Sequence, residues 1–276
     1  MATAPDIAAH YSDGGLLARL EAALRDDGAD PGHPTAEQLA PYDQFHGRGL
    51  EATEDIAALM PAGPGQRLLD VGSGIGGPAR YLARRFSCRV AGIDLTAEFC
   101  AVARALTRRL GQEGRAEFVW GDALAMPFAA AAFDGAYSMN VAMNIADKPG
   151  FYAGIARVLK PGRWLALSEV ARGTGPAPEY PTPWAATEAQ SFLSTPGETR
   201  AGLERAGFVV EKFRDTLDAA LAYAARSRAA VERGEKPPHR AVFLIHGPSA
   251  PAMIANTARA LKDGGLVPIE LLARKR

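Results

Sequence analysis

A glycine-rich turn between an apolar run and a helical segment constrains this chain more than any other feature. Arg67–Val71 is predicted to be a buried β-strand, and a helix is predicted from Pro78 to Phe86. Between them, Gly72, Gly74 and Gly77 follow the spacing G-x-G-x-x-G. Glycine permits a tight turn and lets a ligand come within contact distance of the backbone. The pattern predicts a nucleotide-type ligand at the carboxyl end of the strand.

Short apolar runs alternate with helical segments along residues 65–167, which is typical of parallel βαβ units. The helix expected at 149–159 is followed by Lys160-Pro161-Gly162, which is expected to end it. Thr96 is the expected N-cap of another helix. The predicted strands are 67–71, 89–94, 117–120, 133–138, 163–170, 208–213 and 266–272, with a further strand-like run at 241–245.

The segments outside this alternation are expected to be mainly helical and to cap the carboxyl edge of the sheet, where an open α/β fold binds its ligand. An N-terminal helical cap covers residues 1–60, with one helix at 6–26 and a second, interrupted segment at 35–60. The core comprises 61–172 and 200–276, the latter with helices at 217–233 and 251–262. Residues 173–199, rich in glycine and proline, are predicted to form a mobile lid loop.

Composition excludes several classes of protein. The 276 residues are 47% hydrophobic and 22% charged, which fits a buried core and not a disordered chain. Lysine plus arginine and aspartate plus glutamate both number 31, so no net charge attracts nucleic acid or an anionic membrane. The two cysteines are too few for a disulfide framework, and no His, Cys and Asp cluster has metal-ligand spacing. We expect a soluble, cytoplasmic protein without a metal, and a homodimer is compatible with the sequence.

Acidic residues decide which ligand the glycine turn suits. Asp94, at the end of the second predicted strand, is placed to accept hydrogen bonds from both hydroxyls of a ribose. Asp70, two residues before the first glycine, would repel a pyrophosphate but attract the ammonium of a methionyl group. Asp122 follows the third strand, where it can accept from an adenine amino group. These charges favour S-adenosylmethionine over a dinucleotide.

Five segments together resemble, in order, the motifs of class I S-adenosylmethionine-dependent methyltransferases. The resemblance is greatest to the small-molecule subgroup that includes sarcosine and dimethylglycine, tocopherol, sterol and antibiotic-sugar methyltransferases. It implies a Rossmann-like, seven-stranded, mostly parallel sheet with helices on both faces and a helical cap, and a small-molecule methyl acceptor. The segments are LLDVGSGIGGPARYLA (68–83), GIDLT (92–96), GDALAMPF (121–128), FDGAYS (133–138) and RVLKPGRWLALSE (157–169).

The resemblance also implies which residues hold the cofactor. Ser73 departs from the Cys or Ala that is common in the family, but a small residue there is expected to leave cofactor binding intact. Asp70, Gly72 and Gly74 would surround the methionyl part, Asp94 and Leu95 the ribose and adenine, Asp122 and Ala123 the adenine, and Asn140 the space beside the methionyl group.

The sequence offers two candidates for proton transfer and several for acceptor binding. His46 lies in a His-x-Gly segment similar to one that folds over the cofactor in related enzymes, and it is the expected general base unless it is structural. Glu169, at the end of the fifth strand, is expected to orient or deprotonate an acceptor. Residues expected at the acceptor are Tyr42, Gln44, Met143, Asn144, Trp184 and Phe192, any of which could instead belong to the core.

The sequence therefore predicts methyl transfer from S-adenosylmethionine to an N, O or C atom of a small metabolite, which leaves S-adenosylhomocysteine. Two alternatives stay open. One is a methyltransferase-like cyclase or binding protein that retains the cofactor. The other is an NAD-dependent oxidoreductase, because the glycine pattern alone fits both cofactors.

Overall fold

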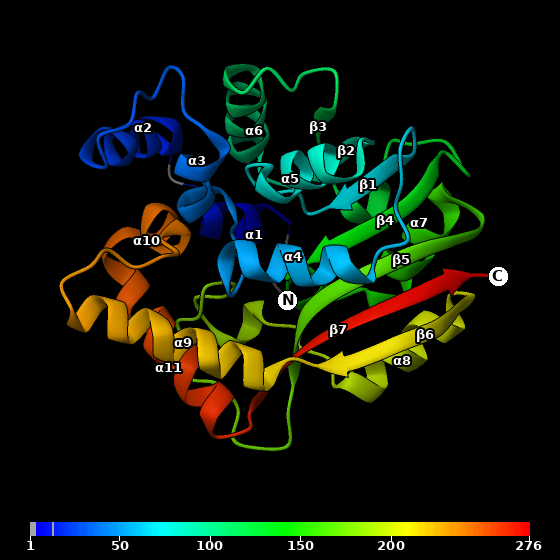
Figure 1. Ribbon diagram of the computed structural model, residues 1–276. Helices are drawn as coiled ribbons and strands as arrows, with labels where there is room; N and C mark the ends of the chain where they lie inside the picture. The colour runs from blue at the N-terminus through cyan, green and yellow to red at the C-terminus, as the bar shows by residue number, and fades with distance from the viewer. Residues whose placement is uncertain (1–3, 13) are drawn as a thin grey trace.

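The computed structural model describes residues 4–12 and 14–276, in which seven strands form a sheet in the order β3-β2-β1-β4-β5-β7-β6 (Figure 1). Only β7 runs antiparallel to its neighbours, β5 and β6. The predicted seven-stranded, mostly parallel sheet is therefore confirmed. The strands are β1 (Arg67–Val71), β2 (Arg89–Asp94), β3 (Ala116–Trp120), β4 (Phe133–Met139), β5 (Leu159–Arg172), β6 (Phe208–Asp215) and β7 (Leu266–Lys275).

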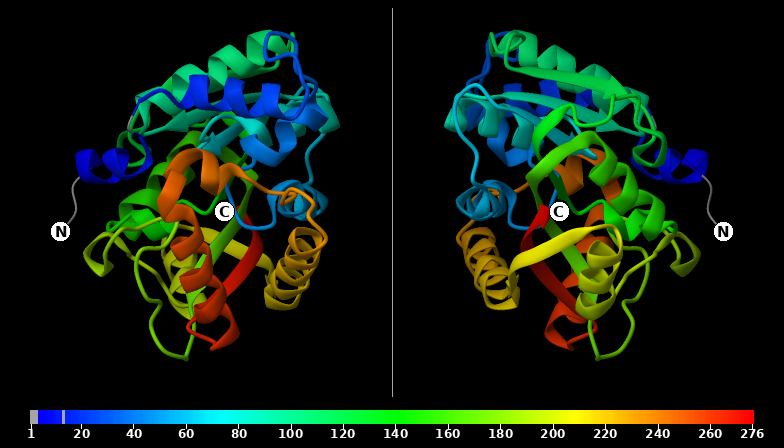
Figure 2. Two further views of the ribbon diagram at one scale, coloured as in Figure 1. Left: turned by 90° about the vertical axis from the view of Figure 1, so that its left-hand side faces the viewer. Right: turned by 90° about the vertical axis from the view of Figure 1, so that its right-hand side faces the viewer.

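Helices cover both faces of the sheet (Figure 2). On one face, Ile56 and Leu82 belong to a buried cluster with strand residues such as Leu68. On the other, Phe151, Ile155 and other buried residues pack against a second set of strand residues. Burial of these side chains is the main stabilising term of such a fold. The first face carries α4 (Gly49–Leu59), α5 (Gly77–Phe86) and α6 (Ala97–Arg109), and the second carries α7 (Lys148–Val158) and α8 (Pro196–Arg205).

The remaining helices lie beyond the carboxyl ends of the parallel strands (Figures 1 and 2). Helix α4, which was expected within the N-terminal cap 1–60, instead packs on the first face of the sheet. A third buried cluster joins α2, α3, α6 and α10, with Leu20, Leu39, Leu106 and Leu244 among its members. Within the described residues, no helix is long and apolar enough to cross a bilayer. The cap comprises α1 (Ala4–Tyr11), α2 (Leu16–Asp26), α3 (Ala36–Asp43), α9 (Leu217–Glu232), α10 (Ala241–His246) and α11 (Ala250–Lys262).

Several local predictions were wrong. The single helix expected over 6–26 is two helices, and Gly15, with φ 79°, stands at the start of the second. Strand β5 begins at Leu159 and not at Arg163, because Leu159 already pairs with Phe133 of β4. The strand-like run 241–245 is helical, since its buried residues have the spacing i, i+3, i+4.

Helix α8 was not predicted, although its first turn carries a recognisable signal. Thr195 is the N-cap residue, and its side chain accepts a hydrogen bond from the backbone N–H of Glu198. The Glu198 carboxylate accepts in return from the Thr195 N–H, which completes a capping box. The expected lid loop therefore ends in a helix that begins at Pro196.

Candidate active site

A cavity of about 660 Å³ lies at the carboxyl ends of the parallel strands, and its walls include residues of the helical cap. Sites for small molecules commonly have about 300–1,000 Å³. We call its two parts the glycine-turn half and the helical half. The glycine-turn half is lined by Asp70, 72–75, 93–96, 121–124 and 139–141, and the helical half by 168–170, 183–184, Phe192, Pro268 and residues of α9 and α11.

Asp70 ends deep in the glycine-turn half with an unsatisfied oxygen. The residue is 2% exposed, and its Oδ2 atom has no hydrogen-bond partner among the described residues. Burial raises the pKa of this carboxyl to about 8. The Tyr137 hydroxyl opposes this shift in part, but the unsatisfied, buried Oδ2 atom costs free energy, so this position suits a ligand that brings a positively charged N–H group.

The turn after β1 requires glycine at two positions. Gly72 has φ 81°, and a Cβ atom there would collide with the Val141 side chain. Gly74 has φ 53°, and a Cβ atom there would have no neighbour within 4 Å. Since Gly74 lines the cavity, its missing side chain leaves open space for a ligand beside the backbone.

Asp94 joins this turn to the end of β2. Its Oδ2 accepts from the Gly74 N–H at 2.8 Å, and its Oδ1 accepts from the Thr96 N–H at 2.8 Å. Thr96 is the N-cap residue of α6, as predicted, but its own side chain makes no capping hydrogen bond. Each carboxylate oxygen keeps a further lone pair for a ligand hydroxyl. Burial raises the pKa of Asp94.

The segment after β3 forms the next part of the wall. Asp122 caps a 3₁₀ turn over Ala123–Ala125, where its Oδ1 accepts from the Leu124 N–H at 2.8 Å. Nearby, the Trp120 indole donates to the carbonyl of Leu95 at 3.0 Å. This bond ties the segment after β3 to the segment after β2, its neighbour in the sheet.

Glu169 supports the segment after β4. Its carboxylate is buried and accepts from the backbone N–H of Ala142 at 3.2 Å and of Val141 at 3.4 Å. Burial raises its pKa to about 7. Asn140 precedes this segment with φ 56°, a left-handed conformation that asparagine tolerates better than most residues. Glu169 thereby holds Val141 against Gly72.

Asn144 ties the N-terminal cap to the loop after β5. Its Oδ1 accepts from the Tyr11 hydroxyl at 2.8 Å, and its Nδ2 donates to the Trp184 carbonyl at 2.6 Å. Met143, beside it, packs with Trp184 in a buried cluster. The amide of Asn144 therefore closes one side of the cavity by joining three distant segments.

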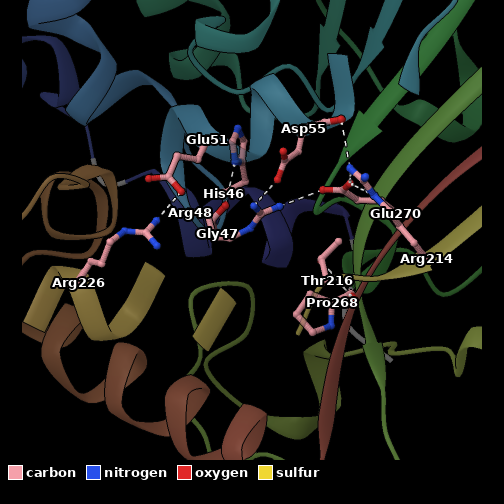
Figure 3. Close-up of polar contacts among 10 residues, drawn as sticks. All are labelled: His46, Gly47, Arg48, Glu51, Asp55, Arg214, Thr216, Arg226, Pro268 and Glu270. Atoms are coloured by element: carbon pink, nitrogen blue, oxygen red, sulfur yellow. Dashed lines mark hydrogen bonds and ion pairs between the residues drawn. The ribbon is translucent and has the colours of Figure 1, made fainter. Parts of the chain in front are cut away.

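His46 lines the cavity from the loop between α3 and α4 (Figure 3). Its Nε2 lies 3.0 Å from Thr53 Oγ1, and its Nδ1 lies 3.3 Å from the Gly47 carbonyl. The Thr53 hydroxyl also lies 2.7 Å from Gln44 Oε1. Burial lowers the pKa of His46 to about 3, so its imidazole is neutral at neutral pH.

The structure brings most of the predicted site residues together. Tyr42 and Gln44 are not among the described residues that line the cavity: the Tyr42 hydroxyl donates to Asp27, and Gln44 lies behind His46. Sequence reasoning missed Tyr11, Val141 and Thr53, which carry no local motif. The predicted residues that line the cavity are His46, Asp70, Gly72, Ser73, Gly74, Asp94, Leu95, Asp122, Ala123, Asn140, Met143, Asn144, Glu169, Trp184 and Phe192.

Comparison with known proteins agrees with this geometry. A family described as "Methyltransferase domain" matches residues 69–167. The O-methyltransferase rstn1 of Aspergillus nomiae is 30% identical over 167 residues, which cover 60% of this chain and 74% of that protein. The chain belongs to the S-adenosylmethionine-dependent methyltransferases. The family predicted from the sequence motifs is thus confirmed.

In other relatives, the region that matches this methyltransferase is a smaller share of the relative's own length. The 24-methylenesterol C-methyltransferase 2 of Oryza sativa subsp. japonica is 44% identical over 109 residues, 40% of this chain and 30% of that protein. The phosphoethanolamine N-methyltransferase of Triticum aestivum is 35% identical over 133 residues, 48% of this chain and 26% of that protein. The chain thus spans less than a third of the length of these two relatives.

Solved structures share the fold of the methyltransferase. The [4+2]-cyclase SpnF superimposes with a TM-score of 0.68 at 23% identity, covering 95% of both chains. Phosphoethanolamine N-methyltransferase 2 of Haemonchus contortus superimposes with a TM-score of 0.70 at 20% identity, covering 95% of this chain and 60% of that one. At these identities the likeness establishes the fold alone.

Proposed function

We propose that this methyltransferase transfers the methyl group of S-adenosylmethionine to an N, O or C atom of a small molecule. The observation that supports the cofactor best is the buried, unpartnered Oδ2 of Asp70 at the floor of a glycine-turn cavity. The ammonium of the methionyl group supplies the missing donor. Gly74 leaves space beside the backbone, and Asp94 offers two carboxylate oxygens to the ribose hydroxyls.

When bound, S-adenosylmethionine supplies an electrophilic methyl group on a sulfonium, and the C–S electron pair stays on sulfur as the acceptor's lone pair forms the new bond. The protein must therefore align the acceptor and exclude water. The Tyr11–Asn144–Trp184 connection closes the cavity on one side. Asn140, Asn144 and Glu169 provide polar groups in its wall.

Catalytic roles for His46 and Glu169 stay predictions. Both ring nitrogens of His46 have protein partners, and its pKa of about 3 makes it a weak base, which supports a positioning role. The raised pKa of Glu169 allows it to take a proton near neutrality, although it also holds Val141 and Ala142. A reducing, cytoplasmic location is supported by the free thiols of Cys88 and Cys100.

The test combines binding with turnover. Tryptophan fluorescence is titrated with S-adenosylmethionine and, separately, with NAD; the proposal predicts saturation only by the former. Methyl-labelled S-adenosylmethionine is then incubated with the protein and a library of small acceptors, with label in a product and an equal amount of S-adenosylhomocysteine expected. Saturation by NAD alone would overturn the proposal, whereas binding without transfer would favour the cyclase or binding-protein alternative.

A further inference from the structure

The helical half of the cavity has a mainly apolar wall. Helix α9 has no buried residue, and Ala220 and Ala224, two of its half-buried positions, line the cavity. Opposite, Ala258 and Leu261 of α11 line the same space. Such a helix pair is stabilised further when an apolar ligand covers it. Other apolar residues of this wall are Val170, Trp184, Phe192, Leu221, Val242, Ile254 and Pro268.

Two polar contacts attach α9 to the rest of the protein, one at its start and one within the helix (Figure 3). At its start, the Thr216 N–H donates to the Pro268 carbonyl at 2.9 Å. Further along, Arg226 forms an exposed ion pair with Glu51 of α4 at 2.7 Å. These contacts hold α9 beside the cavity, and no residue of the helix is fully buried.

Among the residues that the structure describes, the cavity wall has one buried arginine, and protein carboxylates already neutralise its charge. Among the described lining residues, Arg48 is the cation with a buried side chain, at 8% exposure. Its guanidinium pairs with Asp55 and, at 3.0 Å, with Glu270 (Figure 3). Glu270 is fully buried and also binds Arg214. The positive charges of Arg48 and Arg214 are thus balanced by the negative charges of Asp55 and Glu270, which leaves little net charge to attract an anion.

The other charges of the wall also disfavour an anionic acceptor. Arg228 and Lys262 line the cavity with exposed side chains, where solvent screens their charge. The lining carboxyl groups are more numerous than these cations. A phosphate buried here would lose its hydration without a matched cation to offset that loss. The lining carboxyl groups are Asp70, Asp94, Asp122, Asp147 and Glu169, together with Asp43, whose charge is balanced by Arg80.

We propose that the methyl acceptor is an uncharged, predominantly apolar small molecule that lies between α9 and α11. The inference rests on the proposed function and narrows its substrate class. Some relatives and structural neighbours are named for a phosphate-bearing compound, such as phosphoethanolamine or geranyl diphosphate. The acceptor proposed for this chain differs from these compounds because it carries no phosphate. The acceptor's apolar body covers the helical half, and its reacting atom reaches the glycine-turn half beside Asn140.

A matched pair of ligands tests this assignment directly. Geraniol and geranyl diphosphate share one apolar body and differ only in the charged diphosphate. Each is titrated calorimetrically, with and without Mg²⁺, into the full chain saturated with S-adenosylhomocysteine. We expect geraniol to bind at least tenfold more tightly under both conditions. Tighter binding of geranyl diphosphate would overturn the proposal.

Matched variants locate the bound ligand. Ala224→Trp and Ala258→Trp fill the cavity from α9 and α11, whereas Ala222→Trp and Ala255→Trp place the same side chain at exposed positions of the same helices. The first two variants are expected to weaken geraniol binding at least tenfold, and the last two by less than twofold. Equal geraniol affinity in all four variants would contradict the placement between α9 and α11.

A third variant tests the charge balance, and a control distinguishes failure of the proposed function from failure of the acceptor assignment. Asp55→Asn removes one of the carboxylates at Arg48, so geranyl diphosphate binding should strengthen while geraniol binding stays within twofold. An unchanged diphosphate affinity would contradict the role given to this ion-pair network. S-adenosylhomocysteine affinity is measured in every variant. If that ligand fails to bind the wild type, the proposed function fails; if it binds but geraniol does not, only the acceptor assignment fails.

Discussion

Gly74 donates its backbone N–H to Asp94 Oδ2 over 2.8 Å and so joins the turn after β1 to the end of β2. The bond fixes the Asp94 carboxylate and the Gly74 backbone, and both residues line the same cavity. A second constraint lies nearby, where the Val141 side chain occupies the space that a Cβ atom on Gly72 would need. The cofactor site proposed here depends on both.

Gly72→Ala should destabilise the protein and weaken S-adenosylhomocysteine binding. The residue has φ 81° and no room for a methyl group, so Val141 or the turn must move. Overpacking of this kind costs about 1–3 kcal/mol. Urea unfolding measures the loss, with Gly111→Ala as the control, because Gly111 has φ 61° but open space around it. An equal loss in the free energy of unfolding of the two variants would contradict the role of the Val141 contact, because backbone strain alone would then explain the effect.

The affinity for S-adenosylhomocysteine should rise with pH between about 6 and 7.5. Burial raises the pKa of Asp70 to about 8, so below that value a proton must leave before the carboxylate can pair with the ligand's ammonium. Each pH unit then increases affinity by up to about tenfold. Calorimetry across this range should also detect proton release. Asp70→Asn should lose the slope, and a wild-type affinity independent of pH would contradict the role of Asp70.

Much of the cofactor site could be predicted from the sequence because its signals are local. The glycine turn and the carboxylates at Asp70, Asp94 and Asp122 each lie at the end of a predicted strand, and the topology of a parallel sheet brings these ends together. The first expected strand, Arg67–Val71, matches β1 residue for residue.

The cap could not be predicted in the same detail because its contacts join distant segments. Tyr11 and Asn144 are 133 positions apart, and Arg48 and Glu270 are 222 apart. No residue pattern specifies either pair. Tyr42 illustrates the same limit, since its hydroxyl donates to Asp27 within the helical core, and only the packing of α2 against α3 shows this.

His46 variants should distinguish a positioning residue from a general base. His46→Ala is expected to lower turnover, by roughly 10²- to 10⁴-fold if the residue acts as a base. Because its pKa of about 3 lies below the working range, a base role would leave no acidic limb from His46 between pH 5 and 8. A positioning role predicts that His46→Gln restores much of the activity. Turnover of His46→Ala within threefold of the wild type would exclude both roles.

Ligands should slow hydrogen exchange in the N-terminal cap and in the loop after β5. The Asn144 amide connects Tyr11 of α1 to the Trp184 carbonyl beside the cavity, so a bound ligand stabilises both segments. The expected protection covers residues 4–60 and 173–198 once S-adenosylhomocysteine and an acceptor are present. Tyr11→Phe removes the hydroxyl and should reduce this protection. Unchanged exchange on ligand addition would contradict a lid.

We propose that the cavity at the glycine turn binds S-adenosylmethionine through the carboxylates of Asp70 and Asp94. This proposal is tested most directly by calorimetric titration of S-adenosylhomocysteine into the wild type, Asp70→Ala and Asp94→Ala, with Asp218→Ala on the exposed side of α9 as a control. We expect one binding site in the wild type, an unchanged affinity in the control, and a loss of about 1.5–3 kcal/mol of binding free energy in each cavity variant. Unchanged affinity in both cavity variants, with circular dichroism showing an intact fold, would contradict the proposal.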